Sequence, residues 1–188
     1  MCQFLSKRRR GDWGEANAAM AAAAQALEGE LDTFTTGEAG ILVRPSPDQL
    51  GQQAKAEIER ALSGLSPSLA VWRTALDSSE SPHPWVIVSA EGLPALAASI
   101  RAVGEALARA GLGPRVLAAV YPFRWNERKI YWVYQPRIRA FTPFAPAEQG
   151  DDSERDHTLE LLMEKKTRPD LPTSNNTQEW YPVWGMPL

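Results

Sequence analysis

Residues 115–141 read RVLAAVYPFRWNERKIYWVYQPRIRAF, and this stretch gives the strongest structural signal in the sequence. Apolar, aromatic and β-branched residues cluster there between short turn signals. The pattern predicts three successive strands, over residues 115–123, 129–135 and 137–141. Asn126 falls in the first turn, and Pro136 marks the second break. Because residues 130–134 are apolar on both alternating faces, we expect the middle strand to be covered on both sides.

Helices and further strands surround this stretch. Apolar residues at three- and four-residue spacing predict four helices, over residues 12–30, 46–64, 94–110 and 153–166. Short apolar runs predict strands over residues 41–43, 69–76 and 85–90. This order indicates an α+β fold, an antiparallel sheet of about five to six strands with helices packed on it. The element order is also similar to that of type III secretion chaperone-like folds.

Local signals refine the helices. The first one has a narrow apolar face in an alanine-rich segment, so we expect it to rest on the surface of the domain. In the second, Ser46, Pro47 and Gln49 form a helix-start signature. The last one is expected to turn Leu159, Leu162 and Met163 inward.

Length and composition place the chain in a broad class. With 188 residues and 44% hydrophobic content, it has the size of one domain. We expect a flexible basic tail over residues 1–11, one α+β domain over 12–168, and an aromatic, proline-rich tail over 169–188. Cys2 is the single cysteine, and no apolar run is long enough to span a bilayer, which favours a soluble, cytoplasmic protein. The net charge of -3 argues against a nucleic-acid partner.

A search for catalytic chemistry returns little. His83 and His157 lie far from each other and from Cys2, so zinc-type spacing is absent. Asp156 and Glu160 flank His157, but an exposed helical histidine is the simpler interpretation. We therefore predict a protein that is not an enzyme, with no catalytic residues, no metal site and no cofactor. A hydrolase with an unrecognised site remains the minor alternative.

Positive charge is concentrated between residues 115 and 139, where Glu127 is the single acid. The basic residues are Arg115, Arg124, Arg128, Lys129, Arg137 and Arg139. A basic surface of this kind attracts an acidic protein or anionic lipid headgroups. The predicted partner-binding residues are Arg124, Arg128, Lys129, Arg137 and Arg139, with Trp125 as an aromatic anchor. The alternative is a solvated sheet surface balanced by the acidic segment 148–156.

The C-terminal residues are aromatic and punctuated by proline. Trp180, Tyr181, Val183 and Trp184 would expose a large apolar area if this segment extended into solvent. We expect these four residues to dock the tail on the chain's own sheet. Docking into a partner is the alternative.

Three short motifs, FTPFAP at 141–146, RDHTLEL at 155–161 and WYPVWG at 180–185, resemble the PspA-associated protein family PspAB. The stretch from Trp85 to Pro114 is also similar to that family, so the resemblance covers residues 84–188. It implies a bacterial or archaeal accessory factor of the phage-shock, or envelope-stress, response. Such a factor works with the membrane-remodelling coiled-coil protein PspA, and the resemblance transfers no catalytic residue.

We therefore predict a non-enzymatic module that binds a protein partner such as PspA, with the basic hairpin as its contact surface. One rival is peripheral binding to anionic lipids at the inner face of the membrane, through residues 7–10 and the same hairpin. Another is a protein-binding role like that of the secretion chaperones.

Overall fold

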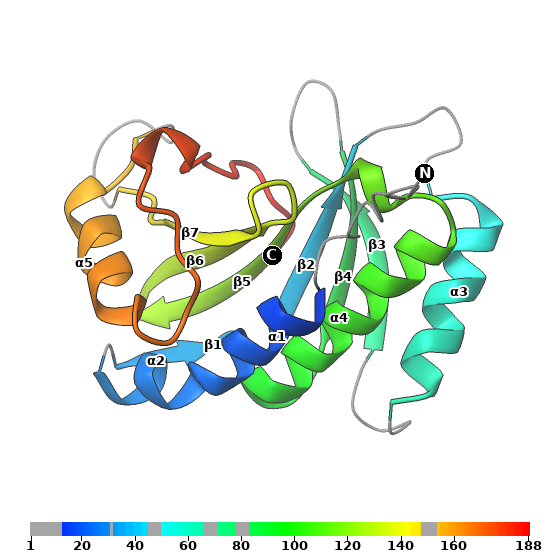
Figure 1. Cartoon of the computed structure of the whole chain (residues 1–188), viewed down its shortest axis with the longest axis horizontal. Helices are drawn as coiled ribbons and strands as arrows, with labels where there is room; N and C mark the ends of the chain where they lie inside the picture. Colours follow the sequence, from blue (N-terminus) through cyan, green and yellow to red (C-terminus); the bar gives the residue numbers. More distant parts are fainter. Residues whose placement is uncertain (1–12, 31, 45–49, 66–70, 78–82, 148–153) are drawn as a thin grey trace, which may run out of the picture.

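The fold of the chain is known from a computed structural model. It describes residues 13–30, 32–44, 50–65, 71–77, 83–147 and 154–188. Within these residues the fold is α+β, as predicted: one open antiparallel sheet with helices packed against it (Figure 1). The predicted tail at 1–11 and the cap at Ser46 and Pro47 lie outside the described residues.

The sheet has strand order β3-β4-β2-β5-β6-β7, and β1 pairs with the far end of β5. Its strands are β1 Thr33–Thr35, β2 Glu38–Val43, β3 Val71–Leu76, β4 Pro84–Ser89, β5 Val116–Trp125, β6 Arg128–Gln135 and β7 Ala140–Phe144. The predicted hairpin turn is confirmed, because Asn126 and Glu127 both adopt positive φ and join Trp125 to its partner Arg128. Residues 130–134 are all buried, so β6 is covered on both faces, as expected.

The helices are α1 Trp13–Ala22, α2 Ala24–Glu30, α3 Gln52–Ser63, α4 Gly92–Arg109 and α5 His157–Thr167. Short 3₁₀ turns follow at Gly113–Arg115 and Thr177–Glu179. The predicted helix over 12–30 is interrupted at Ala23, although backbone hydrogen bonds from Ala23 to Ala19 and from Leu27 to Ala23 continue the helical path. The second predicted helix begins at Gln52, with Gly51 as its N-cap.

Two local predictions were wrong, and one strand was missed. Residues 137–139 belong to a turn in which Ile138 and Arg139 both donate to the Gln135 carbonyl, so β7 begins only at Ala140. Leu162 is 41% exposed. The inward positions of α5 are instead those of Leu159, Glu160, Met163 and Glu164. The short strand β1 was missed, since three residues carry too little periodicity to detect.

The alanine-rich α1 is more deeply packed than its composition suggested. Its apolar stripe is buried, and the ring of Trp13 lies so close to α4 that a Cβ at Gly104 would come within 2.5 Å of it. Trp13 also meets Tyr134 edge-on at 5.5 Å between ring centroids. The Tyr121 hydroxyl donates to Asn17 Oδ1, which ties α1 to β5, and burial raises the pKa of Tyr121 well above its usual value. The small residues therefore allow α1 and α4 to pack closely against each other.

The two faces of the sheet are covered differently. The helix face carries the main core, in which α1, α3, α4 and α5 pack against side chains such as Trp132 and Ile41. The opposite face has a second, smaller core around Trp85, Val133 and Phe144. The C-terminal segment, residues 180–188, covers part of this second core and has no regular secondary structure (Figure 1).

A groove beside the C-terminal segment

The C-terminal segment packs against the chain through several of its side chains. Trp180 is 4% exposed and donates its indole N–H to the Ser174 carbonyl at 2.9 Å. Trp184 meets the Phe144 ring edge-on with 4.7 Å between centroids, and Val183 packs beside it against the same core. Tyr181, in contrast, is 54% exposed. Of the four residues expected to dock the tail, the structure thus places three against the chain and turns one outward.

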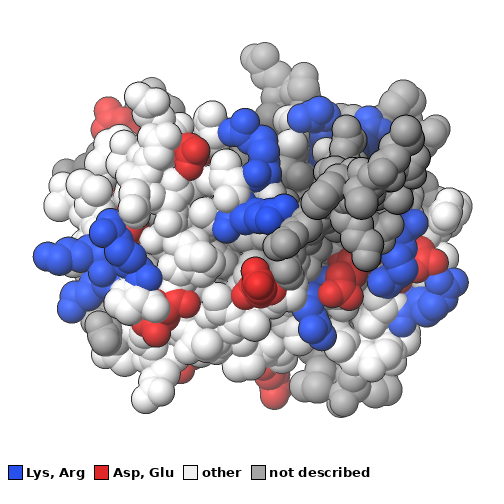
Figure 2. All heavy atoms as spheres, in the orientation of Figure 1, with Lys and Arg blue, Asp and Glu red and all other residues white. Residues whose placement is uncertain are grey.

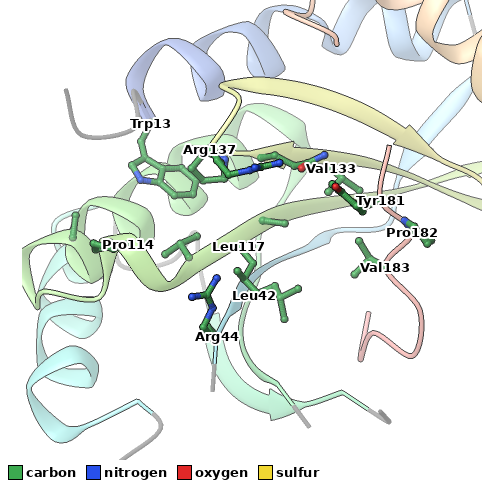
Figure 3. A pocket seen from close by; sticks show the side chains of 16 residues that line it. Trp13, Leu42, Arg44, Pro114, Leu117, Val133, Arg137, Tyr181, Pro182 and Val183 are labelled. Atoms are coloured by element: carbon green, nitrogen blue, oxygen red, sulfur yellow. The ribbon is translucent and has the colours of Figure 1, made fainter. Parts of the chain in front are cut away.

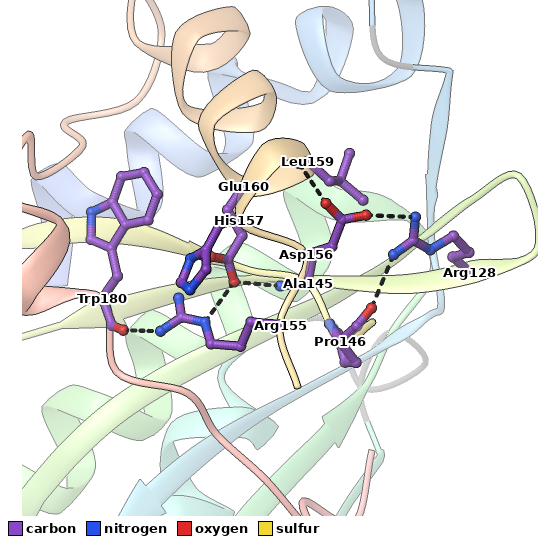
Figure 4. A network of polar contacts seen from close by, with 9 residues as sticks. All are labelled: Arg128, Ala145, Pro146, Arg155, Asp156, His157, Leu159, Glu160 and Trp180. Atoms are coloured by element: carbon purple, nitrogen blue, oxygen red, sulfur yellow. Dashed lines mark hydrogen bonds and ion pairs between the residues drawn. The ribbon is translucent and has the colours of Figure 1, made fainter. Parts of the chain in front are cut away.

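A buried ion pair fixes the point where this segment starts (Figure 4). The side chain of Glu160, on α5, is fully buried and accepts from Arg155 Nε at 2.9 Å and from the Ala145 backbone N–H at 3.0 Å. Arg155 in turn donates through Nη1 to the Trp180 carbonyl. His157 Nδ1 lies 3.0 Å from the same carboxylate, but the histidine side chain is 72% exposed. The carboxylate therefore orients the arginine that holds the segment.

Next to the segment lies an open groove of about 900 Å³. It is bounded by the start of α1, the end of α4 with the 3₁₀ turn after it, the end of β2, the start of β5, the end of β6 with the turn after it, and residues 181–183 (Figure 3). Its walls are mainly apolar, with contributions from Leu42, Val116, Leu117, Ala118, Val133 and Val183. A concave, largely apolar lining with a few polar groups is typical of binding sites in proteins.

Two arginines supply the charge of the groove. Figure 3 shows Arg44 and Arg137 on opposite sides of it, with Leu117 between them in this view. Both side chains are exposed, and neither has a hydrogen-bond or ion-pair partner among the described residues. No carboxylate and no histidine is among the described residues that line the groove. The groove thus combines an apolar floor with two arginines that no described acidic residue neutralises.

Gln135 and Tyr181 are further polar groups of the lining. The Gln135 side chain donates to the Glu179 carbonyl at 2.7 Å and to Thr142 Oγ1 at 3.2 Å, so its amide N–H groups serve the docking of the tail. Tyr181 presents its exposed ring at the mouth. Polar contacts to a bound molecule would therefore come chiefly from the two arginines and the tyrosine.

The predicted partner-binding residues do not share one surface. Arg124, Trp125, Arg128 and Lys129 lie at the tip of the β5–β6 hairpin, whereas Arg137 and Arg139 lie in the turn after β6. The intervening strand separates the two groups by about 20 Å. Figure 2 shows basic side chains over the region where Figure 1 places the β6–β7 turn. Only Arg137 of the predicted set lines the groove.

Two hairpin-tip residues are engaged within the chain. Arg128, 16% exposed, binds Asp156 Oδ2 and the Pro146 carbonyl, both at 3.0 Å. The Leu159 backbone N–H and then Arg128 hold the pKa of Asp156 below its usual value. Lys129 donates to the Leu188 carbonyl at 2.8 Å.

The other members of the predicted set are placed as follows. Arg124 is exposed and lies between Phe34 of β1 and Lys129 of β6 in the strand register. Trp125 is partly buried against the helix-face core. Arg139 is exposed and adopts a φ of 55° in the turn.

Sequence reasoning assigned no role to Arg44. The residue reaches the groove because its backbone N–H donates to the Arg115 carbonyl at 2.8 Å, beside the register shift between β2 and β5. That pairing joins residues about seventy positions apart in the chain. No local pattern in the sequence indicates this long-range pairing.

The residues that the structure describes lack two further kinds of feature. They contain no helix with the length and apolar character that a bilayer crossing requires. They also contain no group of three or more His, Cys, Asp or Glu side chains arranged to hold a metal ion.

An open antiparallel sheet with helices on one face and a docked tail on the other, together with an arginine-flanked apolar groove beside the tail, defines an α+β protein with a binding-type cavity. The chain belongs to the PspAB family, described as PspA associated protein B, which it matches over residues 6–188. The family resemblance found in the sequence is therefore confirmed, and it extends into the N-terminal half. No curated protein and no solved structure matches the chain.

Proposed function

We propose that this protein is a non-enzymatic accessory protein of PspA, and that its groove binds an acidic, amphipathic helix of that partner. Membership in a family named for its association with PspA supports a PspA-linked role. The observation that carries the groove assignment is the pair Arg44 and Arg137, which flank an apolar surface without a carboxylate in its described lining.

The chemistry of the groove selects the kind of partner. An amphipathic helix places apolar side chains on one stripe and charged side chains beside it, which matches an apolar floor between two arginines. Because neither arginine pairs with an acid among the described residues, acidic residues on the helix gain two charge-assisted contacts there. A basic helix would be repelled by the same pair.

Capture of purified PspA by the immobilised protein tests the proposal. The double variant Arg44→Glu/Arg137→Glu should weaken capture at low salt by at least about 10-fold, because two attractive contacts become repulsive. The matched control is Arg101→Glu/Lys166→Glu, which changes the net charge equally at two exposed positions outside the groove. Equal capture by the groove variant and the wild-type protein would refute the proposal.

Two further experiments distinguish the groove from the alternative contact surfaces. The variant Arg124→Glu/Lys129→Glu changes the hairpin tip, and a loss of capture there with none in the groove variant would move the contact to the basic hairpin. Flotation with anionic vesicles in the absence of PspA examines the lipid alternative. Salt-sensitive binding to such vesicles, together with failure to capture PspA, would favour the lipid surface over the protein partner.

A further inference from the structure

The two outer edges of the sheet are finished in different ways. At the β7 edge the chain returns to pair with the strand: Phe141 donates to the Pro172 carbonyl at 2.8 Å, and Ser174 donates to the Phe141 carbonyl at 3.0 Å. At the β3 edge, the strand Val71–Leu76 pairs with β4 on one side only. Among the described residues, none hydrogen-bonds to the backbone groups on its other side.

Exposed strand edges in natural proteins are usually blocked by lysine, proline, a bulge or a covering segment, because an open edge pairs with another strand. The strand β3, with sequence VWRTAL, contains neither lysine nor proline, and its register with β4 is regular. Its single charged residue, Arg73, is directed to Glu38 at 3.3 Å and to the Pro187 carbonyl at 3.2 Å. Val71 is 73% exposed and Leu76 49% exposed. Among the described residues, this edge carries no blocking feature other than Arg73, whose charge is directed to Glu38 and the Pro187 carbonyl.

We propose that β3 pairs antiparallel with β3 of a second copy of this chain, about a two-fold axis perpendicular to the sheet. Such an axis keeps the helix faces of both copies on the same side, so paired residues must share a face. A register centred on Arg73 sets two arginines directly opposite each other, which is destabilising. A register centred on Thr74 instead sets Trp72 opposite Leu76 of the second copy, an aromatic–aliphatic pair.

The surroundings of β3 favour the register centred on Thr74. Trp72, Thr74 and Leu76 lie on the helix face, because their β4 partners include Val86 and Val88 of the main core. A hollow of about 380 Å³ lies beside Leu76, with Leu50 and Pro84 also in its lining. In this register the second copy's Trp72 approaches that hollow and its apolar side chains Leu50, Leu76 and Pro84. A six-residue strand is a short contact, so we expect a dimer in equilibrium with monomer at about micromolar concentration.

A cysteine crosslink at the two-fold axis tests the register. The variant Thr74→Cys, in a Cys2→Ser background, brings the two introduced sulfurs directly opposite each other, with Cβ atoms about 5 Å apart. Mild oxidation should convert most of the protein to a covalent dimer on a non-reducing gel. The matched control, Ala75→Cys, sits opposite Arg73 rather than itself and should stay monomeric. Crosslinking of the control but not of Thr74→Cys would overturn the proposal.

Sedimentation velocity provides a test without a crosslink. The wild-type protein should show a dimer fraction that rises with concentration up to about 100 μM, whereas Thr74→Lys, a lysine at the exposed edge, should remain monomeric. Thr74 is exposed, so this substitution leaves the fold intact, which circular dichroism verifies. A wild-type monomer at every concentration, or a dimer that persists in Thr74→Lys, would refute the pairing. Neither outcome bears on PspA capture, so the two proposals fail independently.

Discussion

The helix face of the sheet and the face under the C-terminal segment are stabilised to different degrees. Among the described residues, the helix-face core contains 33 buried hydrophobic residues and the second core contains seven. Helices cover the first with regular apolar stripes, whereas an irregular segment of nine residues covers part of the second. The groove remains open beside that segment. Burial on the helix face therefore holds most of the fold, which allows the groove beside the C-terminal segment to keep exposed arginines and an unfilled surface.

The sharpest test of this difference compares tryptophans on the two faces. Trp132 is fully buried on the helix face, so Trp132→Ala should lower the free energy of unfolding by about 3–5 kcal/mol. Trp184 is only partly buried in the second core, so Trp184→Ala should lower it by about 1–2 kcal/mol. Urea denaturation followed by circular dichroism measures both values. Equal losses would mean that the two faces contribute equally.

The ion pair at the start of the C-terminal segment should have the next largest effect on stability. Glu160→Ala leaves the partly buried Arg155 without its carboxylate and the Ala145 N–H without an acceptor, which should lower the free energy of unfolding by about 3 kcal/mol. Glu160→Gln is the matched control, because its amide oxygen can still accept from Ala145. It should lose less stability than the alanine variant in the same urea titration. A neutral Glu160→Ala would show that Arg155 does not depend on this carboxylate.

The same contrast explains what could be predicted from the sequence. The strands around Asn126 and the stripe of α4 were predictable because local periodicity and turn chemistry report burial on the helix face. The groove was not predictable, because it depends on Arg44 and Arg137, far apart in the sequence, being placed on opposite sides of one surface by strand pairing. The basic hairpin also looked continuous in sequence, although the length of β6 separates its two ends. Local patterns thus describe the core well and describe long-range surfaces poorly.

Gly40 tests how tightly the second face is packed. A Cβ at this position would lie 2.9 Å from the Trp85 ring and 3.2 Å from the Leu188 side chain. Trp85 is fully buried, so Gly40→Ala should lower the free energy of unfolding by about 1–2 kcal/mol through overpacking. The control is Gly51→Ala, where a Cβ meets nothing within 4 Å. No change in stability at Gly40 would show that the C-terminal segment shifts readily to make room. The segment would then not form a rigid boundary of the groove.

The smallest expected effect lies where the hairpin tip meets α5 on the helix face. Asp156 caps α5 through the Leu159 N–H and pairs with Arg128, and these contacts hold its pKa below its usual value. Because the folded-state pKa of Asp156 is lower than its unfolded-state pKa, this contribution to stability is complete above the unfolded value of about 4 and is lost as the pH falls through the folded value.

The variant Asp156→Asn keeps a capping side chain and removes the charge. It should reduce stability at pH 7 by less than about 1 kcal/mol, since the pair is partly exposed to solvent. Urea titrations at several pH values should show this difference shrinking as the wild-type carboxylate becomes protonated. A difference that stays constant with pH would assign the effect to cap geometry, and the charge would then contribute nothing to the contact between hairpin and helix.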